Sequence, residues 1–392
     1  MKGDKGSAIG LDPSLYVGRG QTYAKHILLK QYLEALAYKV LQSPSAPQEF
    51  LYIDGFSGPW QSQGEQFEDT SFSISLSVLT RVQEHLAANG RIPRIKAVFV
   101  EENSEAFALL RQAVSRFPQI EILTIQGRFE DQIAEITSWL TPSTFMFAFL
   151  DPCGWTGIAL NRIKPLIAHR WSEVLVNLMT NSLVRHVKYE PVKARTAAFF
   201  GGGEWESELH EAETRLGSLE MAIVEVYLRR LRNAANFKCV ATTRIRVPGA
   251  GRTYFHLAYG TRHPAGMDVF RSSEQSCVGV QEGVASETYH ERRERSAGTP
   301  DLFRDAENDG SIAAFQTWQT EARAKAQTEF DDWLHNGKAE IASHWRALLM
   351  QHPYVDRALV NGWMRAAEKA GLLRSERRGS DHLWIPLHGK TV

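Results

Sequence analysis

The sequence contains few cysteines, no excess of charge of either sign and no long apolar run. Its 392 residues include three cysteines, too few and too widely spaced for a disulfide framework or for paired zinc ligands. Its 45 Lys and Arg balance 45 Asp and Glu, so no net charge draws the chain to nucleic acid or membrane. No apolar stretch approaches the roughly 20 residues that span a bilayer, and residues 1–20 lack the apolar segment of a signal peptide. We expect a soluble cytoplasmic protein without a membrane or metal partner.

Apolar runs alternate with helix-like stretches through the first half of the chain. Five runs predict buried strands, at 50–54, 94–102, 121–127, 143–152 and 172–179. Helical patterns lie between them, at 71–89, 103–116, 130–140 and 157–169. The continuous hydrophobicity of the runs indicates burial on both faces of a sheet. This order predicts an α/β fold with a mainly parallel twisted sheet and helices on both faces.

Further elements flank this predicted sheet. Helical spacing is found at 20–43, 204–236 and 311–335, and a turn signal joins a hairpin strand pair at 238–247 and 252–261. Residues 286–311 are charged and poor in apolar residues, which predicts a linker. The tail combines helical spacing with two strands around 377–380, so we expect a winged-helix-like module. The predicted divisions are 1–48 (N-terminal helical segment), 49–275 (α/β domain), 276–337 (linker and helix) and 338–392 (winged-helix-like domain).

The residues that follow the predicted strands are the candidates for chemistry, because ligands of such sheets bind beyond the carboxyl ends of the strands. Asp54 and the small residues after it end the first strand. Glu101 and Glu102 end the second, where a carboxylate accepts hydrogen bonds from ribose hydroxyls. An NAD site is excluded, because no G-x-G-x-x-G follows the first strand and the acidic pair comes far later than 20 residues on. A cationic ligand that carries a ribose, such as S-adenosylmethionine, fits better.

Three motifs together resemble a known family. The segments are 52–60 (YIDGFSGPW), 69–72 (DTSF) and 150–157 (LDPCGWTG). They are similar to the three-Cys-motif partner proteins, a group within the class I S-adenosylmethionine-dependent methyltransferases. The resemblance implies a Rossmann-like methyltransferase fold, a C-terminal winged-helix-like module and a protein partner encoded nearby. The cofactor-binding candidates are Asp54, Gly55, Phe56, Ser57, Gly58, Pro59, Glu101, Glu102 and Phe129.

The loop after the fourth strand should carry the reaction. Its candidate catalytic residues are Asp151, Pro152, Cys153 and Gly154. Amino-group methyltransferases end this strand in Asp or Asn, Pro, Pro and an aromatic residue, so Cys153 and Gly154 depart from the pattern. A Pro-Cys pair also occurs in cytosine-C5 methyltransferases, where the thiol is the nucleophile, but a buried packing thiol is the preferred interpretation of Cys153. Candidate substrate-binding residues are Trp155, Asn177 and Arg185.

Two functions from different classes follow from these residues. The first is methyl transfer from S-adenosylmethionine to an unidentified acceptor, with an amino group on nucleic acid as one hypothesis. The alternative is a noncatalytic methyltransferase-fold partner or regulatory protein that binds nucleic acid or another protein through its C-terminal module. That module has nine Lys or Arg against five Asp or Glu, a local excess of four positive charges. We expect nucleic acid, if bound, to contact Arg374, Arg377 and Arg378.

Overall fold

The computed structural model describes residues 10–58, 62–246, 253–275, 277–278, 304–341, 346–378 and 381–387. Seven strands form one sheet: β1 (Glu49–Asp54), β2 (Arg94–Glu101), β3 (Glu121–Gln126), β4 (Thr144–Leu150), β5 (Ser172–Leu178), β6 (Cys239–Arg246) and β7 (Thr253–Thr261). Their order is β3-β2-β1-β4-β5-β7-β6. Strands β1 to β5 run parallel, whereas β7 pairs antiparallel with both β5 and β6. The expected mainly parallel sheet with a hairpin strand pair is therefore confirmed as a Rossmann-like fold.

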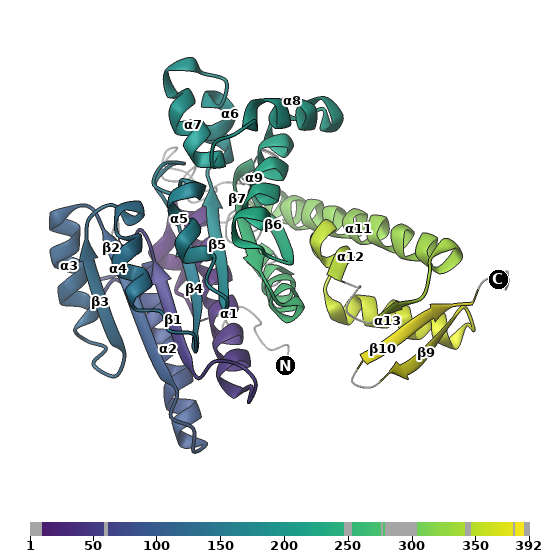
Figure 1. Cartoon of the computed structure of the whole chain (residues 1–392), viewed down its shortest axis with the longest axis horizontal. Coiled ribbons are helices and arrows are strands. Elements are labelled where there is room, and N and C mark those ends of the chain that lie inside the picture. Colours follow the sequence, from purple (N-terminus) through teal and green to yellow (C-terminus); the bar gives the residue numbers. More distant parts are fainter. Residues whose placement is uncertain are drawn as a thin grey trace.

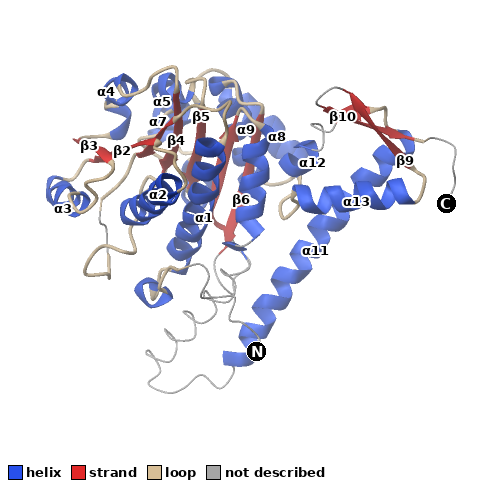
Figure 2. Cartoon of the chain, turned by 90° about the horizontal axis from the view of Figure 1, so that it is seen from below, coloured by secondary structure: helices blue, strands red, loops and turns tan. Residues whose placement is uncertain are grey.

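Helices cover both faces of this sheet (Figure 2). One core packs α1 (Gly20–Gln42), α2 (Ser71–Ala88) and α3 (Ser104–Val114) against one face. The other core packs α4 (Ile133–Ser138), α5 (Leu160–Ile167), α6 (Thr180–His186), α7 (Lys193–Phe200), α8 (Trp205–Leu216) and α9 (Leu219–Ala235) against the opposite face. Short 3₁₀ helices lie at Pro13–Tyr16, Phe129–Asp131 and Glu190–Val192. Neighbouring residues of one strand thus enter different cores, which explains the continuous apolar runs.

The stretch 204–236 is helical as expected, and it is divided into two helices. Helix α8 ends at Leu216, where Gly217 has a φ of 65°, and the hydroxyl of Ser218 caps α9 by accepting a hydrogen bond from the backbone N–H of Met221. A left-handed glycine followed by an N-capping serine ends one helix and begins another. The chain therefore forms two helices, α8 and α9, within the stretch whose spacing predicted helix.

The C-terminal part lies beyond the β6 edge of the sheet (Figure 1). It consists of α11 (Arg304–Asn336), α12 (Arg346–Gln351), α13 (Arg357–Lys369) and a small antiparallel sheet of β8 (Glu340–Ile341), β10 (Asp381–Pro386) and β9 (Leu373–Arg378), in that order. Helix α11 begins seven residues before the expected position, and the expected linker is otherwise outside the described residues. The buried residues of α12 and α13 continue the core of α1 to α3 rather than forming a separate one. The winged-helix assignment and the domain boundaries stay predictions.

Helix 264–275 joins the α/β domain to this C-terminal part. Its buried Arg271 donates hydrogen bonds to the carbonyl oxygens of Leu349 at 2.6 Å and Thr242 at 3.2 Å, and forms an ion pair with Glu274 at 2.8 Å. Glu274 in turn accepts a hydrogen bond from the backbone N–H of Tyr354 at 3.0 Å. A buried ion pair whose partners also bond backbone groups fixes the position of α12 against β6.

Candidate functional site

The first side chain of the site is Asp54, at the carboxyl end of β1. Strand order reverses between β1 and β4, which is the point where sheets of this kind bind ligands. Asp54 is fully buried, and its Oδ1 accepts a hydrogen bond from the backbone N–H of Phe56 at 3.1 Å. Its Oδ2 has no hydrogen-bond partner among the described residues. Burial raises the pKa of Asp54 to about 6, against the opposing effects of Ser71 and the Phe56 N–H. Such a carboxylate is suited to a cationic ligand.

The loop after Asp54 turns tightly under a pocket. The backbone N–H of Ser57 donates to the carbonyl of Val100 at 2.9 Å, and its hydroxyl donates to the carbonyl of Asp54 at 2.8 Å. A Cβ on Gly55 would lie 2.9 Å from the ring of Phe129, so only glycine permits this close approach. Of the predicted loop residues, Gly55 and Phe56 line the pocket, whereas Ser57 lies buried and Gly58 does not line it. Pro59 is outside the described residues.

The pocket holds about 210 Å³ and collects residues from four strand ends. Glu101 is buried and accepts a hydrogen bond from the backbone N–H of Asn103 at 2.7 Å, whereas its neighbour Glu102 is exposed on the rim. Phe129 forms an apolar wall with Phe56, their ring centroids 5.7 Å apart. The structure therefore favours Glu101 as the carboxylate that the pocket presents.

The loop after β4 brings Asp151 to the same edge of the sheet. Both of its carboxylate oxygens are engaged: Oδ2 accepts from the ammonium group of Lys25, and Oδ1 accepts from Nδ2 of Asn177 at 2.6 Å. The side chains of Lys25 and Asp151 are 11% and 17% exposed, so the pair is largely withdrawn from water. Asn177 is buried, and its own Oδ1 has no hydrogen-bond partner within the described parts of the chain.

Lys25 was not expected in the site. It lies on α1, and its ammonium group also lies 5.8 Å from the ring centroid of Phe255 on β7. The sequence offers one weak signal: Lys25 occurs in the mainly apolar run 23–29. The structure buries all seven residues of this run. A buried lysine requires a partner, but the pattern of one helix does not say which carboxylate supplies it.

The preferred interpretation of Cys153 as a buried packing thiol is wrong. Its side chain is exposed at the pocket, because the chain turns sharply from Pro152 to Gly154, whose backbone N–H donates to the carbonyl of Pro152 at 2.8 Å and whose φ is 140°. Partial desolvation and the Asp151 carboxylate raise the pKa of Cys153. A raised pKa leaves less thiolate at neutral pH, which disfavours the nucleophile hypothesis. The other two cysteines, Cys239 and Cys277, are buried.

The remaining candidates lie outside the pocket. Trp155 is buried and lines an adjoining cavity with Phe199, their ring centroids 6.2 Å apart. Arg185 is exposed on α6, where its Nε donates to the carbonyl of Asn181 of the same helix at 3.1 Å, and it lines no described pocket. The described residues contain no cluster of His, Cys, Asp and Glu that suits a metal ion. Among the described helices, none is sufficiently long and apolar to cross a bilayer.

Comparison with known proteins gives matches among solved structures alone. No family model matches the chain, and no curated protein matches it. An O-methyltransferase from Bacillus cereus in complex with SAH is 13% identical over 59% of this chain and 80% of its own, with a TM-score of 0.29. A loganic acid methyltransferase with SAH is 11% identical over 81% of this chain and 92% of its own, with a TM-score of 0.31. A putative O-methyltransferase from Klebsiella pneumoniae is 11% identical over 60% of this chain and 80% of its own, with a TM-score of 0.29. At this level of similarity no ligand or activity transfers to this chain.

Proposed function

We propose that this chain is an S-adenosylmethionine-dependent methyltransferase of the three-Cys-motif partner type. The observation that carries the proposal is the fully buried carboxylate of Asp54 at the switch point of the sheet, whose Oδ2 makes no hydrogen bond of ordinary geometry within the described residues. The cofactor's amino group would supply the missing donor and positive charge, and Glu101 would accept hydrogen bonds from its ribose hydroxyls. Phe56 and Phe129 offer the apolar surface that an adenine needs. When bound, the cofactor supplies an electrophilic methyl group.

The acceptor side is formed by Asp151 and Asn177. Lys25 and the Asn177 amide fix the orientation of the Asp151 carboxylate, which retains lone pairs for one further donor. The buried Oδ1 of Asn177 is a second acceptor beside it. Two acceptors side by side suit the two hydrogens of an amino group, which supports an amine acceptor and, as a finer hypothesis, a base of nucleic acid. These residues hold the acceptor in position for direct displacement at the methyl carbon.

Isothermal titration of the full chain with S-adenosylmethionine tests the proposal. Replacing Asp54 by Ala removes one charge-assisted hydrogen bond, so the affinity should fall about ten- to a hundredfold. Asp332→Ala is the matched control, because Asp332 is exposed on α11 and its loss changes the net charge equally. Absence of binding to the unaltered protein, or equal binding by Asp54→Ala, would refute the assignment.

The alternative is a noncatalytic protein that binds nucleic acid or a protein partner through its C-terminal module. Exposed basic side chains on β9 favour it, since Arg374 and Arg377 both face solvent. Arg374 forms an ion pair with Glu376 at 3.0 Å, which reduces the charge it offers to a phosphate. The pocket at the ends of β1 to β4 and the buried Asp54 next to its lining residue Gly55 favour the enzyme, so we place the noncatalytic function second.

A further inference from the structure

A second cavity adjoins the candidate cofactor pocket on the side of α5 and α7. It holds about 360 Å³, which falls in the usual size range of small-molecule pockets. The two cavities share Arg128, Thr156 and Gly157, which form the wall between them. No other lining residue is common to both, so most of the lining of the second cavity, which we call the chamber, is its own.

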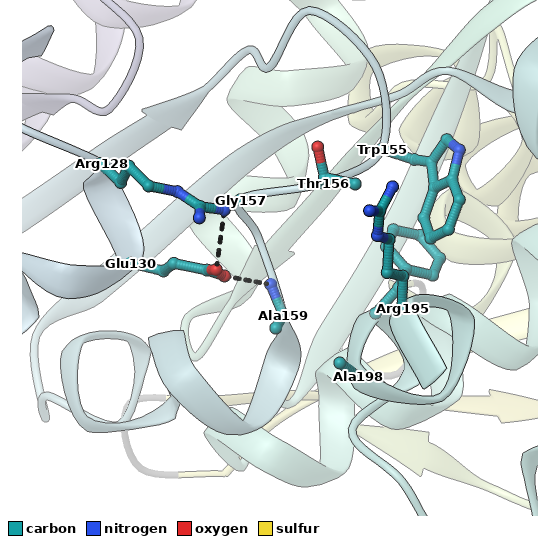
Figure 3. Close-up of a pocket in the computed structure, with 9 residues that line it drawn as sticks. Arg128, Glu130, Trp155, Thr156, Gly157, Ala159, Arg195 and Ala198 are labelled. Carbon is teal, nitrogen blue, oxygen red and sulfur yellow. Dashed lines mark hydrogen bonds and ion pairs between the residues drawn. The ribbon is translucent and has the colours of Figure 1, made fainter. Parts of the chain in front are cut away.

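Two guanidinium groups face this chamber. Figure 3 shows Arg128 reaching in beside Gly157 and Arg195, from α7, rising beside the ring of Trp155. Arg128 makes only a long ion pair, 3.6 Å, to Glu130, and no ion pair to Arg195 is found within the described residues. The carboxylate of Glu130 also accepts a hydrogen bond from the backbone N–H of Ala159 at 3.4 Å. The two guanidinium groups outnumber the single carboxylate of Glu130 among the residues that line the chamber, so the chamber is suited to an anion.

The surface beyond the charges is apolar and rigid. Trp155 and Phe199 meet edge to face, and Phe199 stacks on Tyr227 with ring centroids 4.8 Å apart. Both rings lie in the core that covers this face of the sheet. The wall is therefore fixed before any ligand arrives, which lowers the entropy cost of binding.

We propose that this chamber binds a small organic anion, with one carboxylate or phosphate paired to Arg195, an apolar body against Trp155 and Phe199, and Arg128 adding positive charge from the opposite side. The inference goes beyond methyl transfer, because none of these contacts requires the cofactor. Guanidinium groups pair with carboxylate and phosphate in the same forked geometry, so the head group is defined as a class. The apolar wall selects against a bare inorganic ion.

Calorimetric titration of the full chain without cofactor, using phenyl phosphate, benzoate and inorganic phosphate, tests the inference. At least one of the two organic anions should bind at least tenfold more tightly than inorganic phosphate. Arg195→Ala should weaken that binding about ten- to a hundredfold, and Arg195→Lys, which keeps the charge but loses the fork, should fall between. Arg215→Ala is the control, because this substitution removes the same charge from α8. Arg215 is exposed there and forms an ion pair with Glu225.

Asp54→Asn separates this chamber from the cofactor pocket. It should leave the organic anion's affinity unchanged, whatever the result with S-adenosylmethionine. Failure of both organic anions to bind at about 10 mM, or equal binding by Arg195→Ala, would overturn the inference. Equal affinity for inorganic phosphate would also overturn it, because the apolar wall would then contribute nothing. A loss of binding in Asp54→Asn would show that the anion occupies the cofactor pocket instead.

Discussion

Asp54 is held in a state that costs stability. Its folded-state pKa is about 6 against an ordinary value of 3.8, so folding disfavours the charged form. The resulting loss of folding stability is absent below about pH 4, grows as the pH rises to about 6 and is complete above about pH 6. Asp54→Asn removes the charge while its Oδ1 still accepts from the Phe56 N–H, so we expect a gain of about 3 kcal/mol at pH 8 and none near pH 4. Denaturant unfolding at both pH values measures it.

Asp69 is the control, because its pKa is shifted in the direction opposite to that of Asp54. Despite desolvation, its pKa is lowered, because Ser62, the backbone N–H of Gln63 and Arg19 bond to its carboxylate. Asp69→Asn should therefore lose stability at pH 8, and the loss should shrink as the pH falls below 4. A loss of stability in Asp54→Asn at pH 8 would contradict the account of Asp54.

The pair of Lys25 and Asp151 makes a second prediction. Lys25→Met leaves the Asp151 carboxylate largely buried beside Asn177 without its cation, and breaking such a pair costs roughly 3 kcal/mol. The double variant Lys25→Met, Asp151→Asn should recover part of that loss, because the remaining side chains are neutral. Urea unfolding gives the free energies. Lys39→Met, exposed on the same helix, is the control, and an equal effect of both lysine variants would disprove a structural role for the pair.

Among the elements, helix 264–275 has the clearest testable role. Arg271→Met removes the hydrogen bonds to Leu349 and Thr242 and leaves Glu274 buried without its cation. We expect hydrogen exchange to quicken in α12 and β6, while the strands β1 to β4 keep their protection. Arg365→Met is the control, because Arg365 is exposed on α13 and its replacement removes the same charge. Unchanged exchange in α12 would show that Arg271 does not hold it.

The elements also show how far the sequence alone leads. Strands β1 to β5 were predictable because burial on both faces leaves continuous apolar runs. Helices α6 and α7 were not, because their bulky apolar residues are adjacent, at 183–184 and 199–200, rather than three or four positions apart. The cofactor pocket followed from residues at strand ends, whereas the contact of Lys25 with Asp151 joins positions 126 apart in sequence, which no local pattern reveals. Cys153 was misjudged because exposure there depends on one turn at Gly154.

At the scale of the whole molecule, the C-terminal module and the pocket lie apart. Figure 1 places the module beyond β6, whereas the pocket lies at the ends of β1 to β4. If the module binds nucleic acid, the binding should be weak, tolerant of sequence and strongly salt-dependent. Fluorescence anisotropy with duplex and single-stranded DNA and RNA should show loss of binding in the triple alanine variant of Arg374, Arg377 and Arg378. Low-salt binding by this variant equal to that of the unaltered protein would exclude these arginines.

The same comparison has a matched control. Arg111, Arg116 and Arg170 are exposed and carry the same charge outside the module, and their triple alanine variant changes the net charge equally. Loss of binding in both variants would indicate a dispersed electrostatic attraction rather than a contact surface on β9.

Helix α1 lies against β6, and the thiol of Cys277 contacts the carbonyl of Ala24 at 3.0 Å, across 253 positions of sequence. A chain growing on the ribosome therefore makes this helix well before β6 and the segment around Cys277 that pack on it. Until the segment around Cys277 emerges, apolar residues of α1 such as Leu28 and Leu33 lack part of their cover. The nascent protein thus passes through a long interval in which a chaperone would find a hydrophobic helix to bind, and slow synthesis of β6, β7 and the segment up to Cys277 would lengthen that interval.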